Sequence, residues 1–341
     1  MSFLKLLGEG GIVIVAAILV TYLILPLVQR LRQRMSIVWA IAVTYALIVL
    51  VLGLTVLWVV PPLVAQAHAL IVSLPALFAS LQQKLADPTN PLIAKSPPEV
   101  RTYLVSLPAE INKLVATYGL GMAQRALGVL FSVVSLFLSV IIVPILAAYL
   151  FFDTPDVKRG FLGLFPPSAR PKTIAILTDV DRVIGAFVRG QVLDGLILAV
   201  MVSVMLWALH VPYALLIGVA AGFLNLVPYL GAIIGFIPSV TLALAYNGWE
   251  NALLVALLFA VIQQVDGNFI LPRIMKENVL LSPLVIIVSI LVFSALFGVV
   301  GTFLAVPIAA ILRVLKLHFL PAPPPAEMAA AQTQAQHLRV F

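Results

Sequence analysis

Long apolar runs with few charges dominate the chain, and short polar segments separate them. A helix needs about 20 apolar residues to cross the hydrocarbon of a bilayer, and most of the runs reach that length. This pattern predicts an all-α, polytopic membrane protein with about seven to eight spans. The runs cover residues 10–28, 37–60, 126–152, 183–209, 213–246, 252–266 and 282–312.

The run at residues 213–246 is too long for one crossing, and Pro228, Gly231 and Gly235 interrupt it. Proline lacks an N–H group and leaves a carbonyl one turn earlier without its partner. An unpaired main-chain group is costly in hydrocarbon, so irregular main chain occurs only where protein or a water-filled cavity covers it. We therefore expect this break to face a cavity, with the amide side chain of Asn225 beside it.

The run at residues 282–312 repeats the interruption at Gly298 and Gly301. Two broken or re-entrant helical hairpins in the second half of a membrane protein are typical of a transporter site. We expect Gly298 and Gly301 to form a hinge or a hairpin tip. The alternative is that these residues serve close packing, because glycine and proline are common in membrane helices.

Polar side chains gather at one predicted helix end, in the sequence VIQQVDGNFILP at residues 261–272. Ionisable residues inside membrane spans are costly and usually functional, so Asp266 is a candidate to carry a proton or to ligate a cation. The alternative is a carboxylate that pairs with Arg273 at the cytoplasmic interface. The candidates for the substrate or ion pathway are Asn225, Pro228, Gly231, Gly235, Gln263, Gln264, Asp266, Asn268 and Pro272, together with Asp194.

Asp194 lies deeper in an apolar run than Asp266 does, and after Arg189 it is the only charge between residues 190 and 209. It is therefore a second candidate for a coupling residue. The alternative is an ion pair with Arg189 or Arg182.

Composition supports the membrane class and excludes several others. The chain of 341 residues is 63% hydrophobic and 10% charged, with a mean hydropathy of +1.17, so membrane lipid must solvate much of its surface. The net charge of +7 reflects membrane topology, and no basic run with interleaved aromatics indicates nucleic-acid binding. With no cysteine, no metal-ligand spacing of histidines and no phosphate-binding loop, we expect neither an enzyme nor a cofactor or metal site.

The polar segments suggest how the chain is organised. Three arginines in QRLRQR at residues 29–34 place that loop in the cytoplasm, and the same rule places the C-terminus there. The expected parts are spanning helices at 1–62, an extracytoplasmic amphipathic helical module at 63–125, a spanning helix at 126–152, a cytoplasmic insert at 153–182, a transport core at 183–317 and a disordered tail at 318–341.

Several stretches of the chain resemble the autoinducer-2 exporter family of predicted permeases. They are LPLVQRLRQR, VRGQVLDGLI, HVPYALLIGVAAGFLNLVPYLGAIIGFIPS, QQVDGNFILPRIMKENVLLSPL and LFGVVGTFLAVPIAAILRVL. The resemblance implies a multi-pass permease of the bacterial inner membrane that exports the quorum-sensing furanone or exchanges sodium for protons. It also implies a homo-oligomer, such as a pentamer, with an elevator-like moving part, and site residues at the positions named above.

From these observations we expect a secondary transporter for a small polar solute or an ion. The solute would bind where the broken main chain meets the Gln, Asp and Asn side chains, and Asp266 or Asp194 would couple its movement to protons or sodium. A sodium/proton antiporter, an oligomeric channel and a membrane scaffold are the alternatives. The unusual residues are concentrated inside the membrane, which favours the carrier.

Overall fold

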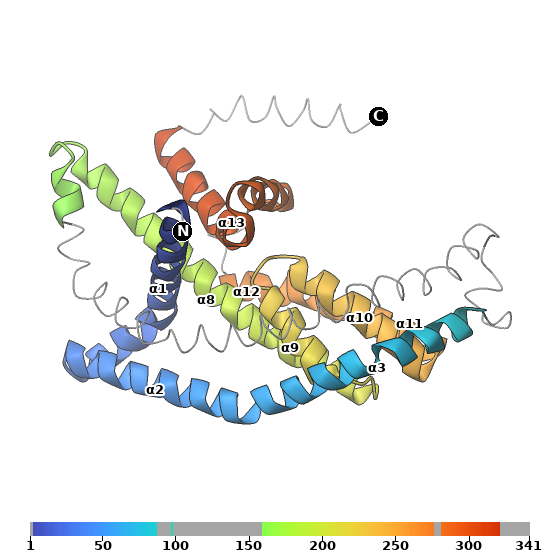
Figure 1. Ribbon diagram of the computed structural model, residues 1–341. Helices are drawn as coiled ribbons and strands as arrows, with labels where there is room; N and C mark the ends of the chain where they lie inside the picture. Colours follow the sequence, from blue (N-terminus) through green and yellow to red (C-terminus); the bar gives the residue numbers. More distant parts are fainter. Residues whose placement is uncertain (1–2, 87–96, 98–158, 276–280, 321–341) are drawn as a thin grey trace. The chain divides into compact units, whose positions relative to one another are not determined.

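A computed structural model describes residues 3–86, 97, 159–275 and 281–320, and every regular element within them is a helix (Figure 1). The all-α class expected from the apolar runs is thereby confirmed. The predicted span at 126–152, the larger part of the predicted module at 63–125 and residues 321–341 of the predicted tail lie outside the described residues.

Residues 3–86 of the described chain form the helices α1 (Phe3–Arg32), α2 (Ile37–Trp58) and α3 (Val60–Ala86). Pro61 and Pro62 lie in the first turn of α3, where a helix has no need of their missing N–H groups. Instead of ending the apolar run, the two prolines therefore begin a new helix directly after α2.

The C-terminal part begins with the long helix α8 (Arg170–Ala208). It is followed by α9 (Ala214–Leu224), α10 (Leu230–Asn247), α11 (Trp249–Val265), the π-helix η3 (Asp266–Ile270), α12 (Leu271–Met275) and α13 (Pro283–Phe319).

Five helical stretches among the described residues are long and apolar enough to cross a bilayer, which is consistent with a multi-pass membrane protein. They are Ile37–Leu81, Arg170–Ala208, Leu230–Asn247, Trp249–Met275 and Gly301–Phe319. Two shorter apolar helices, Ala214–Leu224 and Leu284–Gly298, accompany them.

A break occurs in each of the two predicted runs, at residues 225–229 and at Gly298, whereas Gly231 and Gly235 lie within the regular helix α10 and Gly301 within α13. Residues 225–229 separate α9 from α10, which pack against each other as a helical hairpin. In α13 the main chain leaves the helical conformation at Gly298, where φ is 62° and ψ is −141°. Only glycine adopts such angles readily, so this residue permits the kink.

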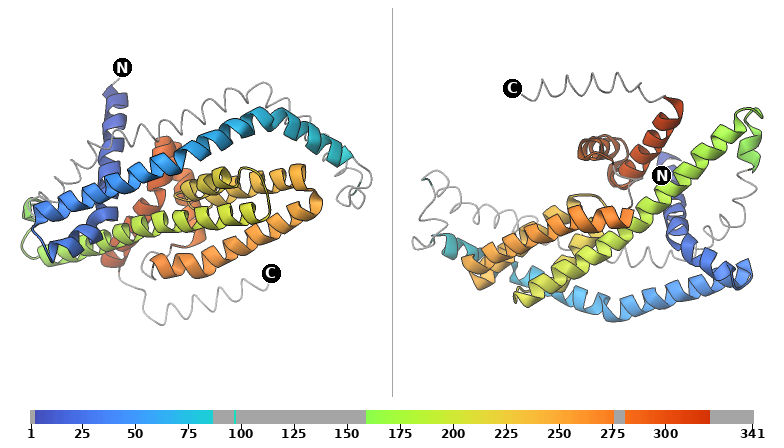
Figure 2. Two further views of the ribbon diagram at one scale, coloured as in Figure 1. Left: turned by 90° about the horizontal axis from the view of Figure 1, so that it is seen from below. Right: turned by 180° about the vertical axis from the view of Figure 1, so that it is seen from behind.

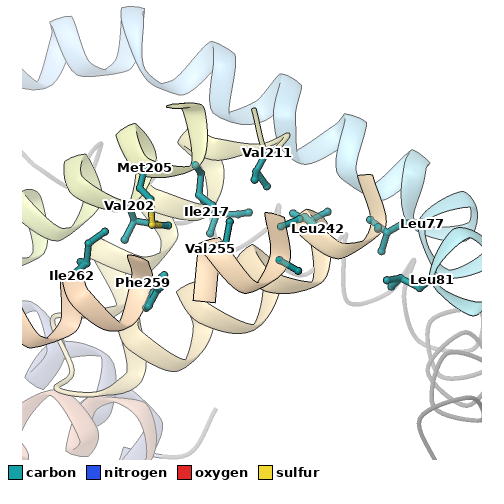
Figure 3. Close-up of a cluster of buried hydrophobic side chains, with 14 of the residues drawn as sticks. Leu77, Leu81, Val202, Met205, Val211, Ile217, Leu242, Val255, Phe259 and Ile262 are labelled. Carbon is teal, nitrogen blue, oxygen red and sulfur yellow. The ribbon is translucent and has the colours of Figure 1, made fainter. Parts of the chain in front are cut away.

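The chain divides into two compact units, Met1–Thr154 with Val188–Leu280, and Pro155–Phe187 with Leu281–Phe341. In the first unit α10 packs against α9, α11 and α3. Both views of Figure 2 show α10 and α11 running side by side. A cluster of buried apolar side chains from α3, α8, α9, α10 and α11 forms the core of this unit (Figure 3).

Helix α3 is attached to the α9–α10 hairpin by polar as well as apolar contacts. The Oε1 atom of Gln66 accepts the main-chain N–H of Leu216, near the start of α9, at 3.0 Å. The hydroxyl groups of Ser73 and Tyr213 lie 2.8 Å apart. Because the N–H groups of a first helical turn lack intrahelical acceptors, Gln66 supplies one that α9 itself cannot.

In the second unit the end of α13 contacts the first half of α8. Nε2 of His318 lies 3.4 Å from the Asp179 carboxylate, which also binds Arg182 at 3.1 Å. The Lys172 ammonium lies 4.4 Å from the centre of the Phe319 ring. Such exposed contacts contribute little stability, so they orient the helix end rather than hold the unit together.

One extra residue interrupts the regular helix after Asp266. The main-chain N–H of Leu271 donates to the carbonyl of Asp266, five residues earlier, which defines a π turn. Past this turn α12 packs against α8, since a Cβ atom added at Gly190 would lie 2.9 Å from the Cγ atom of Met275. Single π turns inside α-helices occur frequently at functional sites.

Candidate functional site

Glycines bring α8 and α9 into close contact beside the predicted break. A Cβ atom added at Gly222 of α9 would lie 2.2 Å from the main-chain oxygen of Gly195 on α8. A Cβ atom added at Gly231 of α10 would lie 2.3 Å from the main-chain oxygen of Ala221. Small residues thus allow three helices to approach main chain to main chain. This approach places Asn225, at the end of α9, next to the turn of α8 that carries Asp194.

Asp194, Asn225 and Asp266 come together at this place, from three different helices. Only 1% of Asp194 and 7% each of Asn225 and Asp266 are exposed. The Nδ2 atom of Asn225 donates to Oδ2 of Asp194 at 2.8 Å. The carboxyl group of Asp266 lies near enough to that of Asp194 for the two to interact electrostatically. We call these three residues the carboxyl cluster.

The carboxyl cluster contains oxygen atoms whose hydrogen-bonding capacity is unused. Among the described residues, Oδ1 of Asp194 and Oδ1 of Asp266 are buried and have no donor. Two carboxyl groups can share a hydrogen bond only if one of them carries a proton, because a carboxylate has acceptors alone. The arrangement can therefore hold a proton or a small cation between the two groups. The nearby α11 residue Gln263 has a buried Nε2 atom that likewise lacks an acceptor in the described part.

The local structure explains the position of each member of the cluster. Asn225 follows the last residue of α9, and its main-chain N–H donates to Ala221. Asp266 ends α11 and begins the π turn. Asp194 lies within the continuous helix α8, one residue before Gly195. Helix ends and π turns thus contribute two of the three side chains, as expected for a site built on interrupted helices.

Several main-chain groups at the α9–α10 break form hydrogen bonds within the protein. Leu230 donates its N–H to the carbonyl of Val227 at 3.2 Å, and Tyr229 between them has a φ of 70°. This pattern indicates a type II turn, whose second position favours proline, as found here at Pro228. The carbonyl of Asn225 accepts a hydrogen bond from the amide of Gln191, which is only 5% exposed.

The ion pairs that offered an alternative explanation for Asp194 are not the contacts observed in the structure. Arg182 binds Asp179 on the exposed side of α8, and Arg189 donates to the main-chain oxygen of Tyr22 at 3.1 Å. The observed partners of Asp194 are Asn225 and Asp266. Asp266 likewise has Asp194, rather than Arg273, as its observed partner.

The other predicted pathway residues lie around the cluster or away from it. Gly235 packs closely against Ala221 and Phe259 in the helix contact. Gln264 and Asn268 are exposed and bind each other at 3.0 Å, so they do not join the carboxyl cluster. Pro272 is a partly buried residue of α12. Gly298 and Gly301 belong to the second unit, where Gly301 packs closely against the main-chain oxygen of Phe293.

Gln191 is the member of the site that the sequence did not identify. It precedes Asp194 by three residues on α8, a spacing that places both side chains on one face of a helix. That spacing was the available signal. A glutamine three residues before a buried aspartate in an apolar run could have been grouped with it.

The oxygen atoms of the carboxyl cluster can bind a hard cation or a proton. No group of three or more His, Cys, Asp or Glu side chains that could hold a metal occurs within the described ranges. Two carboxyl groups and an amide provide oxygen atoms for a hard cation, and they provide positions for a proton.

Comparison with known proteins agrees with a transport role. Residues 6–320 match the family described as "AI-2E family transporter". The chain is 34% identical over 200 residues to "Putative transport protein YrrI" of Bacillus subtilis, which covers 59% of this chain and 56% of that protein. It is 30% identical over 179 residues to "AI-2 transport protein TqsA" of Escherichia coli, covering 52% and 51% of the two chains.

A third relative, "Putative permease PerM" of Escherichia coli, is 26% identical over 259 residues, covering 75% of this chain and 71% of that protein. The matched part of this chain spans 50% to 58% of the length of the first three curated relatives. The family match extends over nearly the whole sequence and includes every helix of the carboxyl cluster. The chain therefore belongs to the AI-2E family of transporters.

Proposed function

We propose that this protein is a secondary transporter of the bacterial inner membrane that exports a small polar solute such as autoinducer-2, driven by protons or sodium. One observation carries the proposal: two buried carboxyl groups, Asp194 and Asp266, contact each other inside helices long enough to span a bilayer. Ionisable side chains at such positions are costly, and they persist where they serve ion movement.

The choice of autoinducer-2 as the proposed solute is supported by a relative rather than by the site. One relative is named "AI-2 transport protein TqsA", and the family description carries the same term. The unpaired Nε2 atom of Gln263 and the two unpaired carboxyl oxygens offer both donors and acceptors. A small neutral solute with hydroxyl and carbonyl groups is complementary to such a set.

An elevator-like movement, a homo-oligomer and a cytoplasmic C-terminus complete the proposal. The α8–α9 contact is formed by glycines that have no side chains to interlock, which supports sliding of the α9–α10 hairpin along α8. During such a cycle the proton or cation would reside between Asp194 and Asp266 on one side of the membrane and leave on the other.

The test is flux in proteoliposomes made from the full chain. Asp194→Asn and Asp266→Asn preserve side-chain size but remove the group that carries the proton. We expect both variants to lose proton- or sodium-driven uptake of the furanone down to the level of empty vesicles. Glu250→Gln is the matched control, because Glu250 is an exposed carboxylate on the same helix as Asp266 and should retain full flux. Full ion-driven flux in either aspartate variant would refute the coupling role.

Sodium/proton antiport is the second candidate, and the unused oxygen atoms of the carboxyl cluster favour it. Oδ1 of Asp194 and Oδ1 of Asp266 can alternate between one proton and one sodium ion without any organic solute. Sodium-driven proton movement in vesicles that contain no furanone would support this function. Strict dependence of proton movement on the furanone would exclude it.

A further inference from the structure

Gln191 occupies a place in the site that neither the family match nor the proposed function assigns. Its side chain is buried on α8, one turn before Asp194, and its Nε2 atom donates to the main-chain oxygen of Asn225. A buried amide with such a bond is costly to alter, because its removal leaves the carbonyl partner without a donor.

The carbonyl of Asn225 depends on an external donor because of the break in the helix. The last carbonyls of α9 lack intrahelical partners, as at every helix end. In a regular helix this carbonyl would accept from the N–H of Tyr229, whose φ of 70° takes the main chain out of the helical path. Gln191 therefore supplies, from the neighbouring helix, the bond that a regular helix would have formed.

The two hydrogen bonds of Asn225 close a ring with α8. Its main-chain oxygen accepts from Gln191, and its Nδ2 atom donates to Oδ2 of Asp194 at 2.8 Å. Asn225 is thus held at its main chain and at its side chain by two residues one turn apart on the same helix. The orientation of the Asp194 carboxyl group depends on both bonds.

We propose that Gln191 is a positioning residue that sets the ion and proton affinity of the Asp194–Asp266 pair by holding Asn225 against Asp194. The importance of Gln191 for transport rests on the proposed function. Its effect on the proton affinity of the Asp194–Asp266 pair does not depend on that function. A hydrogen bond to the carboxylate form favours that form. Loss of the Gln191 bond should therefore release Asn225 and raise the proton affinity of the pair.

The other charged groups on the surrounding helices do not compensate for the loss of the Gln191 hydrogen bond. Arg189, on the same helix, donates to the main-chain oxygen of Tyr22. Arg273 of α12 is exposed. The titratable groups that meet in the cluster are Asp194 from α8 and Asp266 from the end of α11.

The experiment follows the protonation of the carboxyl pair directly by infrared difference spectroscopy of the full-length protein in lipid. The C=O stretching band of the pair is identified by its loss in Asp194→Asn and in Asp266→Asn. Gln191→Met keeps the length of the side chain and removes the donor, and should raise the proton affinity about tenfold. Gln191→Asn keeps the amide but is one methylene too short to make the same bond, so it should shift the titration in the same direction as Gln191→Met.

Gln66→Ala is the matched control, because it removes a glutamine bond to the opposite end of the same helix α9. It should lower stability without moving the titration. An unchanged titration in Gln191→Met, or the same shift in Gln66→Ala, would overturn the positioning role. Should Gln191→Met fail to fold, the titration of Gln191→Asn decides the question, and an unchanged titration there would overturn the positioning role. Ion-driven flux is measured on the same samples. Absence of flux in the wild type would refute the proposed function, and the titration would still test the role of Gln191.

Discussion

Replacement of Gly231 by alanine tests whether the close approach of α9 and α10 holds the carboxyl cluster together. The new Cβ atom would lie 2.3 Å from the main-chain oxygen of Ala221 and 2.7 Å from the main-chain nitrogen of Asn225. Ordinary van der Waals contact begins at 3.4 Å, so the two helices must separate by about 1 Å. Main-chain atoms cannot rotate away, and overpacking of this kind costs about 2 kcal/mol.

The same displacement reaches the site. If α9 moves by about 1 Å, the bond from Asn225 to Asp194, now 2.8 Å, stretches to about 3.8 Å and is lost. We expect the melting temperature in detergent to fall by about 5 °C and ion-driven flux to fall by about a hundredfold, since misplacement by 1 Å has effects of that size at reacting groups.

Gly267→Ala provides the control for this substitution. Gly267 follows Asp266 directly, yet nothing lies within 4 Å of a Cβ atom added there. Its melting temperature should stay within about 1 °C of the wild type, because the added methyl group meets no neighbour. A Gly231→Ala protein with the stability and flux of the wild type would refute the argument that this contact determines the geometry of the cluster.

Three further substitutions test other parts of the fold. Phe259→Ala removes a ring that is 1% exposed and packs edge-on against Phe236 at 5.5 Å, so thermal unfolding should show a loss of about 3–5 kcal/mol; a loss below about 1 kcal/mol would contradict the core assignment. Gly298→Ala meets no neighbour within 4 Å but needs a φ of 62° with a ψ of −141°, so denaturant unfolding should show a loss of about 1–3 kcal/mol that arises from the main chain alone. Tyr229→Asn should raise the melting temperature by about 1–2 °C, because asparagine tolerates the φ of 70° better than tyrosine; a lower melting temperature would show that the tyrosine ring contributes more than the strain costs.

The interruptions of the helices could be predicted from the sequence, and the meeting of the three polar residues could not. Pro228 and Gly298 mark local changes of the main chain, and such changes depend on the residue itself. Asp194 and Asn225 are 31 positions apart, and their contact depends on how closely α8 and α9 approach. Gly195 and Gly222 determine that approach, and the sequence of neither helix alone shows that these two residues meet.

The polar residues near Asp266 illustrate the same limit. Asp266, Gln264 and Asn268 form one group in the sequence, yet the first is buried and the other two bind each other on the exposed side. A regular α-helix would continue one helical phase through all three residues, and the π turn alters that phase after Asp266. The extra residue is a property of tertiary packing, because the segment DGNFI contains nothing that excludes a regular helix apart from its glycine.

The π turn also determines which sequence changes the last part of α11 and α12 can accept. Met275 follows Asp266 by nine positions, and a regular helix of about 100° per residue would turn it to the opposite side. The additional residue rotates it back by about one such step, so that it can meet Gly190. A chain shortened by one amino acid at Gly267 would keep its helical content and its hydrophobicity. It would nevertheless lose the contact between Met275 of α12 and Gly190 of α8. In this segment the number of residues therefore matters more than their chemical kind.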